Sequence, residues 1–329
     1  MTVSLSKIGF VPVNDAFDVA YDSANELCYV AATATDTLSV VDVSNPASPS
    51  VIGSVQDGTA LNGARGVAYD PAREVCYVAA LTYDGLAVVD VSNPASPSVV
   101  GSVAASSMND VRDVAYDSAN QRCYMAGRSS RSLTVVDVST LASPSVVGSI
   151  SGDIRLLNAV GVAYDAANEV CYVVSGNDGI TVVDVSNPAS PAIINTPTFT
   201  GVDSRIDVVF DSANQRAYVS DAVNDTIEVW DVSTPASASV VGSVTDATTL
   251  DAVRGVAHDS ANELCYVVTQ GAHTGVTAID VSNPASPFVV DDISGVLTQP
   301  ARIAYDPARG LCFVTDPDAN GLYVFNVFV

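Results

Sequence analysis

Basic residues are scarce in this chain of 329 residues. It holds 13 Lys and Arg, of which only Lys7 is a lysine, against 37 Asp and Glu, and its formal net charge at pH 7 is −24. Proteins bind nucleic acids and anionic membranes through clusters of Lys and Arg. The charge balance therefore predicts that neither is a partner. The chain also lacks a run of 18 apolar residues, so we expect no membrane-spanning helix.

Residues and motifs for catalysis are also few. The sequence has two histidines and contains no G-x-S-x-G, H-E-x-x-H, P-loop or G-x-G-x-x-G element. Neither histidine has an obvious partner for acid–base chemistry. We therefore expect a protein that is not an enzyme. A hydrolase or lyase that uses loop carboxylates is the alternative, because 32 aspartates supply many carboxylate pairs.

An export signal is absent as well. The first 13 residues lack a cationic segment followed by a long apolar one, and they lack a twin-arginine pair. We expect a chain that folds inside the cell without a cleaved leader. Six cysteines agree with this expectation, because free thiols persist in a reducing cytosol.

The charged residues that are present have an unusual composition. Of the acidic residues 32 are Asp and 5 are Glu, and 12 of the 13 basic residues are Arg. At about 1 M salt the Debye length is roughly 3 Å, so repulsion between carboxylates is largely screened. A surface rich in Asp and poor in Lys suits such conditions. The composition indicates a halophilic source, with an ordinary acidic protein as the alternative.

A repeat runs through the whole chain. A VAYD-like segment recurs seven times with a spacing of 46 to 48 residues, at 19–22, 67–70, 114–117, 162–165, 208–211, 256–259 and 303–306. Each of the first six copies is followed by a polar turn, a CYVAA-like segment, a variable loop, a segment like GLAVVDVS, a turn like NPASP and a segment like SVVGSV. The pattern predicts four short strands in each unit.

Four strands every 40 to 50 residues are typical of a β-propeller. We therefore predict an all-β fold with seven four-stranded blades, in a single domain over residues 1–329. The last unit ends before its fourth strand, and the missing segment is found at residues 5–11, LSKIGFV. The N-terminal strand should therefore complete the last blade and close the ring.

These segments resemble a known family. The stretch GLAVVDVSNPASPSVVGS at 85–102, with CYVAA before it, resembles the LVIVD repeat of bacterial and archaeal propellers. The stretch VAYDSANELCYV at 19–30 is also similar to the YVTN-type propeller repeat. The resemblance implies a β-propeller fold, but it implies no particular activity, because such propellers share none.

Residues found in every unit should serve the scaffold. Seven Asp residues end the VAYD segments and should accept backbone N–H groups in the following turn: Asp22, Asp70, Asp117, Asp165, Asp211, Asp259 and Asp306. Six more should cap the turn after the third strand: Asp42, Asp90, Asp137, Asp184, Asp231 and Asp280. All six cysteines occupy one position of the second strand, so they should be buried, free thiols.

The loops divide into two sets. The turns after the first and third strands hardly vary, whereas the connections between blades and those after the second strand differ in every blade. Alternate connections of an antiparallel blade share one rim, and variable loops on a rigid scaffold usually carry binding. We call this side the diversified rim and expect function there.

Seven charged residues fall beside the start of the innermost strands on this rim: Arg65, Arg112, Arg254, Arg302, Asp18, Asp113 and Asp207. We expect them to ring the mouth of the central channel. They could form ion pairs between neighbouring blades, or they could bind an anion or a glycan.

One loop resembles half of a calcium site. The residues Asp316, Asp318 and Asn320 match the first half of a calcium-binding loop, but Val327 stands where the second half requires Glu. They are candidate calcium ligands, and we expect no other cofactor.

Together these observations predict a non-enzymatic interaction module from a halophilic system. The interpretation we favour is a virion structural component, namely a capsid turret, decoration or host-attachment protein of an archaeal tailed virus. Such a protein is made in the host cytoplasm and then exposed to high salt. Its partners would be other proteins of a larger assembly or a surface glycan. The alternative is a cell-surface adhesion or glycan-binding propeller of a haloarchaeon.

Overall fold

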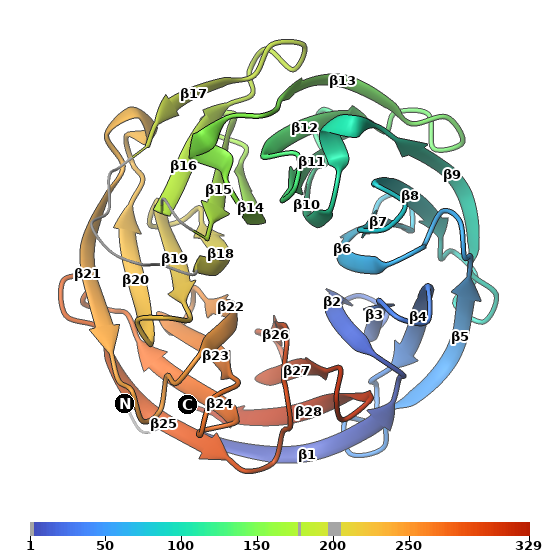
Figure 1. Cartoon of the computed structure of the whole chain (residues 1–329). Coiled ribbons are helices and arrows are strands. Elements are labelled where there is room, and N and C mark those ends of the chain that lie inside the picture. The colour runs from blue at the N-terminus through green and yellow to red at the C-terminus, as the bar shows by residue number, and fades with distance from the viewer. Residues whose placement is uncertain (1–2, 177–178, 197–204) are drawn as a thin grey trace.

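The computed structural model describes residues 3–176, 179–196 and 205–329. These residues form seven four-stranded antiparallel sheets, which stand around a central axis as the blades of a propeller (Figure 1). In each blade the first strand after a connection lies nearest the axis, and the fourth lies at the outside of the ring. The predicted fold class is confirmed.

The strand boundaries follow the sequence repeat. Blade 1 contains β2 (Ala16–Asp22), β3 (Leu27–Ala32), β4 (Thr37–Asp42) and β5 (Ser50–Gln56). Blade 2 contains β6 (Ala64–Asp70), β7 (Val75–Ala80), β8 (Gly85–Asp90) and β9 (Ser98–Ala104). Blade 3 contains β10 (Val111–Asp117), β11 (Arg122–Gly127), β12 (Ser132–Asp137) and β13 (Ser145–Ile150). Blade 4 contains β14 (Ala159–Asp165), β15 (Val170–Ser175), β16 (Gly179–Asp184) and β17 (Ala192–Asn195).

The remaining blades continue in the same order. Blade 5 contains β18 (Arg205–Asp211), β19 (Arg216–Asp221), β20 (Thr226–Asp231) and β21 (Ser239–Thr245). Blade 6 contains β22 (Val253–Asp259), β23 (Leu264–Thr269), β24 (Gly275–Asp280) and β25 (Phe288–Ser294). Blade 7 contains β26 (Ile303–Asp306), β27 (Leu311–Asp316), β28 (Gly321–Phe328) and β1 (Ser4–Pro12). The connections that the structure describes contain three short 3₁₀ segments: η1 (Ser106–Met108), η2 (Ile154–Leu156) and η3 (Pro235–Ser237). Within the described ranges, no helix is long and apolar enough to cross a membrane.

The N-terminal strand closes the ring as predicted. β1 pairs antiparallel with β28, from Ser4 opposite Phe328 to Pro12 opposite Gly321. The last blade therefore has the strand order β1-β28-β27-β26 and takes its outermost strand from the start of the chain (Figure 1). In addition, the Leu5 N–H donates to the Asp291 carboxylate of blade 6 at 2.7 Å. This bond fastens the closing strand to the blade before it.

The core lies between neighbouring blades. The second strand of most blades is buried along its whole length, as in β7 and β23. Its cysteines are free and buried, as the sequence predicts. Burial raises the pKa of each thiol well above its ordinary value, because an apolar environment disfavours the thiolate.

The repeated aspartates have the predicted roles. Asp22 accepts the N–H of Ala24 at 2.9 Å in the turn after β2, and Asp42 accepts the N–H of Ser44 at 2.8 Å after β4. Equivalent bonds occur in all the other units with these aspartates. The sequence does not reveal a second role of the first set. The Tyr116 hydroxyl of blade 3 donates to Asp70 of blade 2 at 2.7 Å, so these carboxylates also join neighbouring blades.

Candidate functional site at the channel mouth

The diversified rim is held together by carboxylates. Asp36, in the loop between β3 and β4, accepts the N–H of Gly63 in the connection to blade 2 at 2.8 Å. Asp84 and Asp225 make the same bond to the N–H groups of Asp110 and Ala252, each at 2.9 Å. Each bond ties a loop within a blade to the connection that leaves it. The sequence signal of these bonds is an Asp directly before the third strand, within a loop that otherwise varies between blades.

Three of the predicted channel residues join pairs of blades. Asp18 accepts the N–H of Val19 in its own blade and that of Val67 in the next blade, both at 2.8 Å. Asp113 and Asp207 accept two N–H groups in the same way: Val114 and Val162 for Asp113, and Val208 and Val256 for Asp207. Three carboxylates thus satisfy six backbone donors and join blade 1 to 2, 3 to 4 and 5 to 6.

Glycine occupies the equivalent position in the partner blades. Gly66, Gly161 and Gly255 stand where blades 1, 3 and 5 have Asp. A Cβ atom on Gly66 would lie 2.8 Å from the Cα of Asp113, and one on Gly255 would lie 2.8 Å from the Cα of Arg302. Side chains are therefore excluded where the innermost strands of consecutive blades approach most closely.

Arg302 takes this position in the seventh blade. Its side chain is 12% exposed, and its Nε lies 3.9 Å from the Asp207 carboxylate. Burial acts to lower the pKa of Arg302, but the carboxylates of Asp207, Asp18 and Asp113 together raise it above its ordinary value. This arginine is therefore a shared counter-ion of the three aspartates.

One guanidinium does not balance three buried carboxylates. Burial raises the pKa of Asp18 to about 6 and that of Asp113 to about 7, although Arg302 opposes the shift. Burial also raises the pKa of Asp207. Because like charges in a dry site cannot all ionise together, we expect this group to retain protons near neutral pH.

The other three arginines are each the second residue of an innermost strand, in β6, β10 and β22. The Arg65 guanidinium stacks on the Phe17 ring at 3.7 Å from its centroid. The Arg112 Nε lies 2.7 Å from the Asp110 carboxylate. The Nε of Arg254 is buried and has no hydrogen-bond partner among the residues that the structure describes. Of the two interpretations of the charged ring, ion pairing therefore accounts for Arg112 and Arg302, while neither Arg65 nor Arg254 is paired with a described acidic residue.

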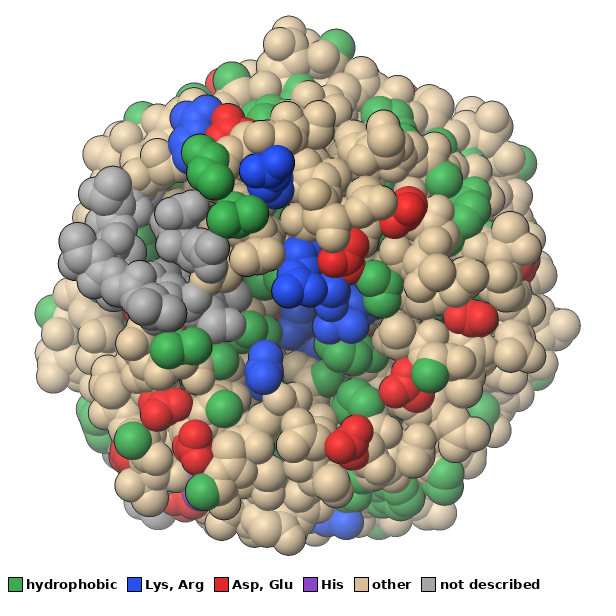
Figure 2. Space-filling model, in the orientation of Figure 1, with side chains coloured by type: hydrophobic (Ala, Val, Ile, Leu, Met, Phe, Trp, Pro, Cys, Tyr) green, Lys and Arg blue, Asp and Glu red, His purple; other side chains and the backbone are tan. Residues whose placement is uncertain are grey.

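The unpaired arginines lie close to other positive charges. Burial, together with Arg112 and Arg302, lowers the pKa of Arg65 to about 9. Burial and Arg302 also lower the pKa of Arg254. Figure 2 shows the hollow at the centre of this rim with basic side chains gathered around it, on a face with scattered acidic side chains. An anionic group placed there would relieve the repulsion among the guanidinium groups and could accept bidentate hydrogen bonds.

The candidate calcium ligands are used in hydrogen bonds. The buried Asp316 carboxylate accepts the N–H groups of Thr298, Gln299 and Ala319 at 2.6 to 3.0 Å. Asn320 accepts the N–H of Asp15 through Oδ1 at 3.1 Å, and Asp318 is exposed. Among the described residues no group of three His, Cys, Asp or Glu side chains is placed to hold a metal. The calcium site stays a prediction.

One hydroxyl–imidazole–carboxylate arrangement was not foreseen. The His273 Nε2 lies 2.7 Å from the Asp292 carboxylate, and its Nδ1 lies 3.2 Å from the Thr269 hydroxyl. Thr269 is fully buried, and its hydroxyl also donates to the His273 carbonyl. A buried hydroxyl that is held in this way is not placed to attack a substrate. The arrangement therefore stabilises the loop after β23.

Comparison with known proteins identifies the repeat. The family model described as the LVIVD repeat matches five segments, each covering the second to fourth strands of a blade: 27–57, 76–105, 124–151, 170–196 and 265–293. The similarity of the first hairpin to the YVTN-type repeat stays a sequence-based interpretation. No curated protein matches the sequence.

The fold also resembles a solved structure. The chain is similar to the crystal structure of the Myceliophteria thermophila Cps50 (Swd1) β-propeller domain, with a TM-score of 0.78 and 11% sequence identity, over 99% of this chain and 100% of that one. At this identity the likeness concerns the fold alone. With five matched repeats and seven blades of the same plan, the chain belongs to the LVIVD-repeat β-propellers.

Proposed function

We propose that this propeller is a non-enzymatic interaction module whose diversified rim binds an anionic group of a partner protein or glycan at the channel mouth. The observation that carries the proposal is the pair Arg65 and Arg254. The Arg65 guanidinium stacks on the Phe17 ring, the buried Arg254 Nε has no hydrogen-bond partner among the described residues, and neither side chain forms an ion pair with a described acidic residue. Elsewhere the chain is strongly acidic, with a net charge of −24. Unpaired arginines at the axis of such a protein favour a carboxylate, sulfate or phosphate there.

Direct titration with small anions tests the proposal. Sulfate and citrate are titrated calorimetrically into the wild-type protein and into the double variant Arg65→Gln, Arg254→Gln, at constant ionic strength. We expect saturable binding to the wild type and at least a tenfold weaker affinity in the variant. The matched control is Arg155→Gln, because Arg155 lies on the same rim but is exposed and paired with Asp153 at 2.7 Å. Equal binding by all three proteins would refute the proposal.

As a more specific function we propose a virion structural component in a halophilic system, with a role as a capsid turret, decoration or attachment protein. The observation that favours it is the excess of Asp over Lys, 32 against one, which suits a surface that faces concentrated salt. The cell-surface adhesion propeller is its alternative. Association of the purified protein with virions or with cell envelopes, measured by co-sedimentation in molar KCl, distinguishes the two.

A further inference from the structure

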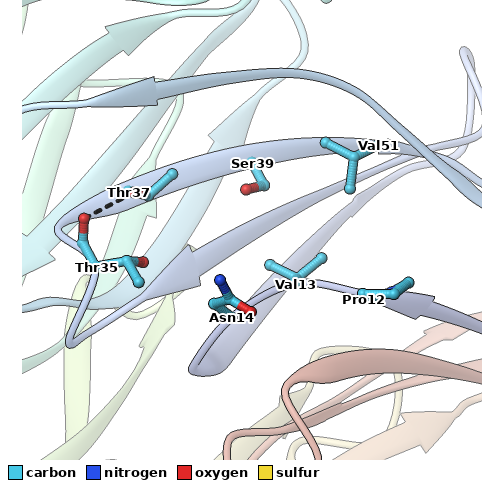
Figure 3. A pocket seen from close by; sticks show the side chains of 7 residues that line it. All are labelled: Pro12, Val13, Asn14, Thr35, Thr37, Ser39 and Val51. Atoms are coloured by element: carbon cyan, nitrogen blue, oxygen red, sulfur yellow. Dashed lines mark hydrogen bonds between the residues drawn. The ribbon is translucent and has the colours of Figure 1, made fainter.

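A pocket opens where the ring closes, between blade 7 and blade 1. It has a volume of about 320 Å³, which lies at the lower end of the range for ligand sites. We call it the closing pocket, and its lining includes Val13, Asn14, Thr35, Thr37, Ser39 and Val51 (Figure 3). Hydroxyl and amide groups therefore face apolar side chains, and none of the described residues that line the space is charged.

The other junctions show what normally fills this space. In four of them a buried Leu or Met lies three residues before the next innermost strand: Leu61, Met108, Leu156 and Leu250. Each is preceded by a short turn, such as 57–60 or 246–249. We call this turn with its apolar residue the cap.

A hydroxyl from the third strand fastens the cap in three of these junctions. Thr134 donates to the carbonyl of Ser107, just before Met108, at 2.9 Å. Thr181 and Thr277 donate in the same way to the carbonyls just before Leu156 and Leu250, at 2.6 and 2.7 Å. The arrangement consists of one buried hydroxyl, one main-chain carbonyl and one apolar side chain.

The closing junction has the hydroxyl and an apolar residue but lacks the turn of the cap. Ser39 is the third residue of β4, as Thr134 is of β12, and it is 6% exposed. The connection from β1 to β2 has only the three residues Val13–Asp15, and Val13 takes the place of the buried Leu or Met. The Ser39 hydroxyl makes no hydrogen bond with any described residue, and it points into the pocket (Figure 3).

We propose that the closing pocket binds a short turn segment of a partner protein, which supplies the missing cap. A main-chain carbonyl of that segment accepts the Ser39 hydroxyl, and an apolar side chain next to it packs on Val13 and Val51. The described ends of this chain do not fill the site, because Ser4 and Phe328 lie at the opposite end of β1 from Pro12. The lining of this pocket includes neither Arg65 nor Arg254, so the inference does not depend on the function proposed above.

The chain itself provides the probe. A fluorescent, end-blocked peptide with the sequence DATTL of residues 246–250 reproduces a cap. Its binding is followed by fluorescence anisotropy, with protein added to millimolar concentration. We expect saturable binding, at least fivefold weaker in Ser39→Ala and lost in Val51→Trp, which blocks the pocket. Val240→Trp is the matched control, because Val240 is also the second residue of an outermost strand and is 40% exposed, against 42% for Val51.

A second variant tests the same idea without a free peptide. Replacing Val13–Asp15 by the seven residues 246–252 builds the cap into the closing junction. We expect this variant to have a higher thermal midpoint than the wild type and no affinity for the peptide. The proposal is overturned if the peptide binds wild type and Val51→Trp equally, or if it does not bind at all. Binding of neutral monosaccharides but not of the peptide would also overturn it, in favour of a sugar site.

Discussion

Raising the pH from 5 to 8 should destabilise the folded ring through the buried carboxyl groups at its axis. In the unfolded chain Asp113 has an ordinary pKa near 3.8, whereas burial raises its pKa in the folded protein to about 7. Between these values the folded state holds a proton that the unfolded state has lost. Stability from such a group is fully present below the lower pKa and is lost as the pH rises through the higher one.

The size of the effect follows from the two pKa values. One unit of pKa shift corresponds to about 1.4 kcal/mol. Over the interval from pH 5 to 8, linkage gives a loss of about 3 kcal/mol from Asp113, and Asp18, whose pKa is about 6, adds about 1 kcal/mol. His258 acts in the opposite direction. Burial lowers its pKa, so its contribution to stability is gained as the pH rises toward the ordinary value of 6.5.

The variant Asp113→Asn separates these contributions. Asparagine keeps one acceptor for the N–H groups of Val114 and Val162 but places an amide donor against the other, which should cost about 1 kcal/mol or more at pH 5. Asparagine carries no charge at pH 8, whereas Asp113 is ionised there. The loss of stability caused by the substitution should therefore be smaller at pH 8 than at pH 5, or become a gain. The measurement is the difference in free energy of unfolding between variant and wild type, from urea titrations at pH 5, 6, 7 and 8 in constant KCl. His258 cancels from that difference.

Asp42→Asn is the control for this experiment. Hydrogen bonds from Ser44 lower the pKa of Asp42, so its titration is complete below pH 5 and its contribution should be constant over the interval. If the difference between Asp113→Asn and wild type were also the same at pH 5 and pH 8, Asp113 would be ionised throughout. The account of three carboxyl groups sharing one guanidinium would then be wrong.

Three further predictions concern the ring as a whole. Deleting residues 1–12 should lower the free energy of unfolding by several kcal/mol, because β28 loses its partner strand and the buried Leu5 and Val11 are lost. Urea titration of the truncated chain measures this, and unchanged stability would mean that the ring closes in another way. All six cysteines should react slowly with a thiol reagent in the native protein and quickly in urea, and a native disulfide found by mass spectrometry would contradict this. The thermal midpoint should rise with KCl from 0.1 to 1 M. Over this range the Debye length falls from about 10 Å to roughly 3 Å, so repulsion within a chain of net charge −24 is increasingly screened. Equal midpoints would contradict the prediction of a halophilic source.

The sequence predicts the fold because each blade repeats the same local rules. Strand alternation, the Asp that ends each VAYD segment and the NPASP turn all recur in register, and the incomplete last unit identifies the closing strand. The position of the cysteines in one strand also predicts their burial, since equivalent positions in a propeller lie too far apart to be bridged. These inferences depend on position within a repeat, which self-comparison shows directly.

The seven charged residues stand in or directly before the innermost strands, and their role as a binding site stays a prediction. The sequence did not show that three of them bind the backbone of the following blade. The sequence shows Asp and Gly alternating at one position of the innermost strands, as in Asp18, Gly66 and Asp113. The reason for this alternation is how closely the innermost strands of neighbouring blades approach, which only the structure shows. The sequence did not predict the closing pocket. The pocket is present because the connection from β1 to β2 has only three residues, whereas the corresponding connections of other blades are longer.

An odd number of blades explains the charge at the axis. Each Asp of the innermost strands serves its own blade and the next, so three of them join six blades in pairs and leave the seventh without a partner. A fourth Asp at position 302 would add another buried negative charge beside Asp207, whereas Arg302 balances part of the existing charge from the same position. The same cation lowers the pKa of Arg65 and of Arg254, so Arg302 interacts electrostatically with the three aspartates and with these two arginines. If the proposed anion binds to Arg65 and Arg254, its binding should therefore be coupled to the protonation of the three aspartates.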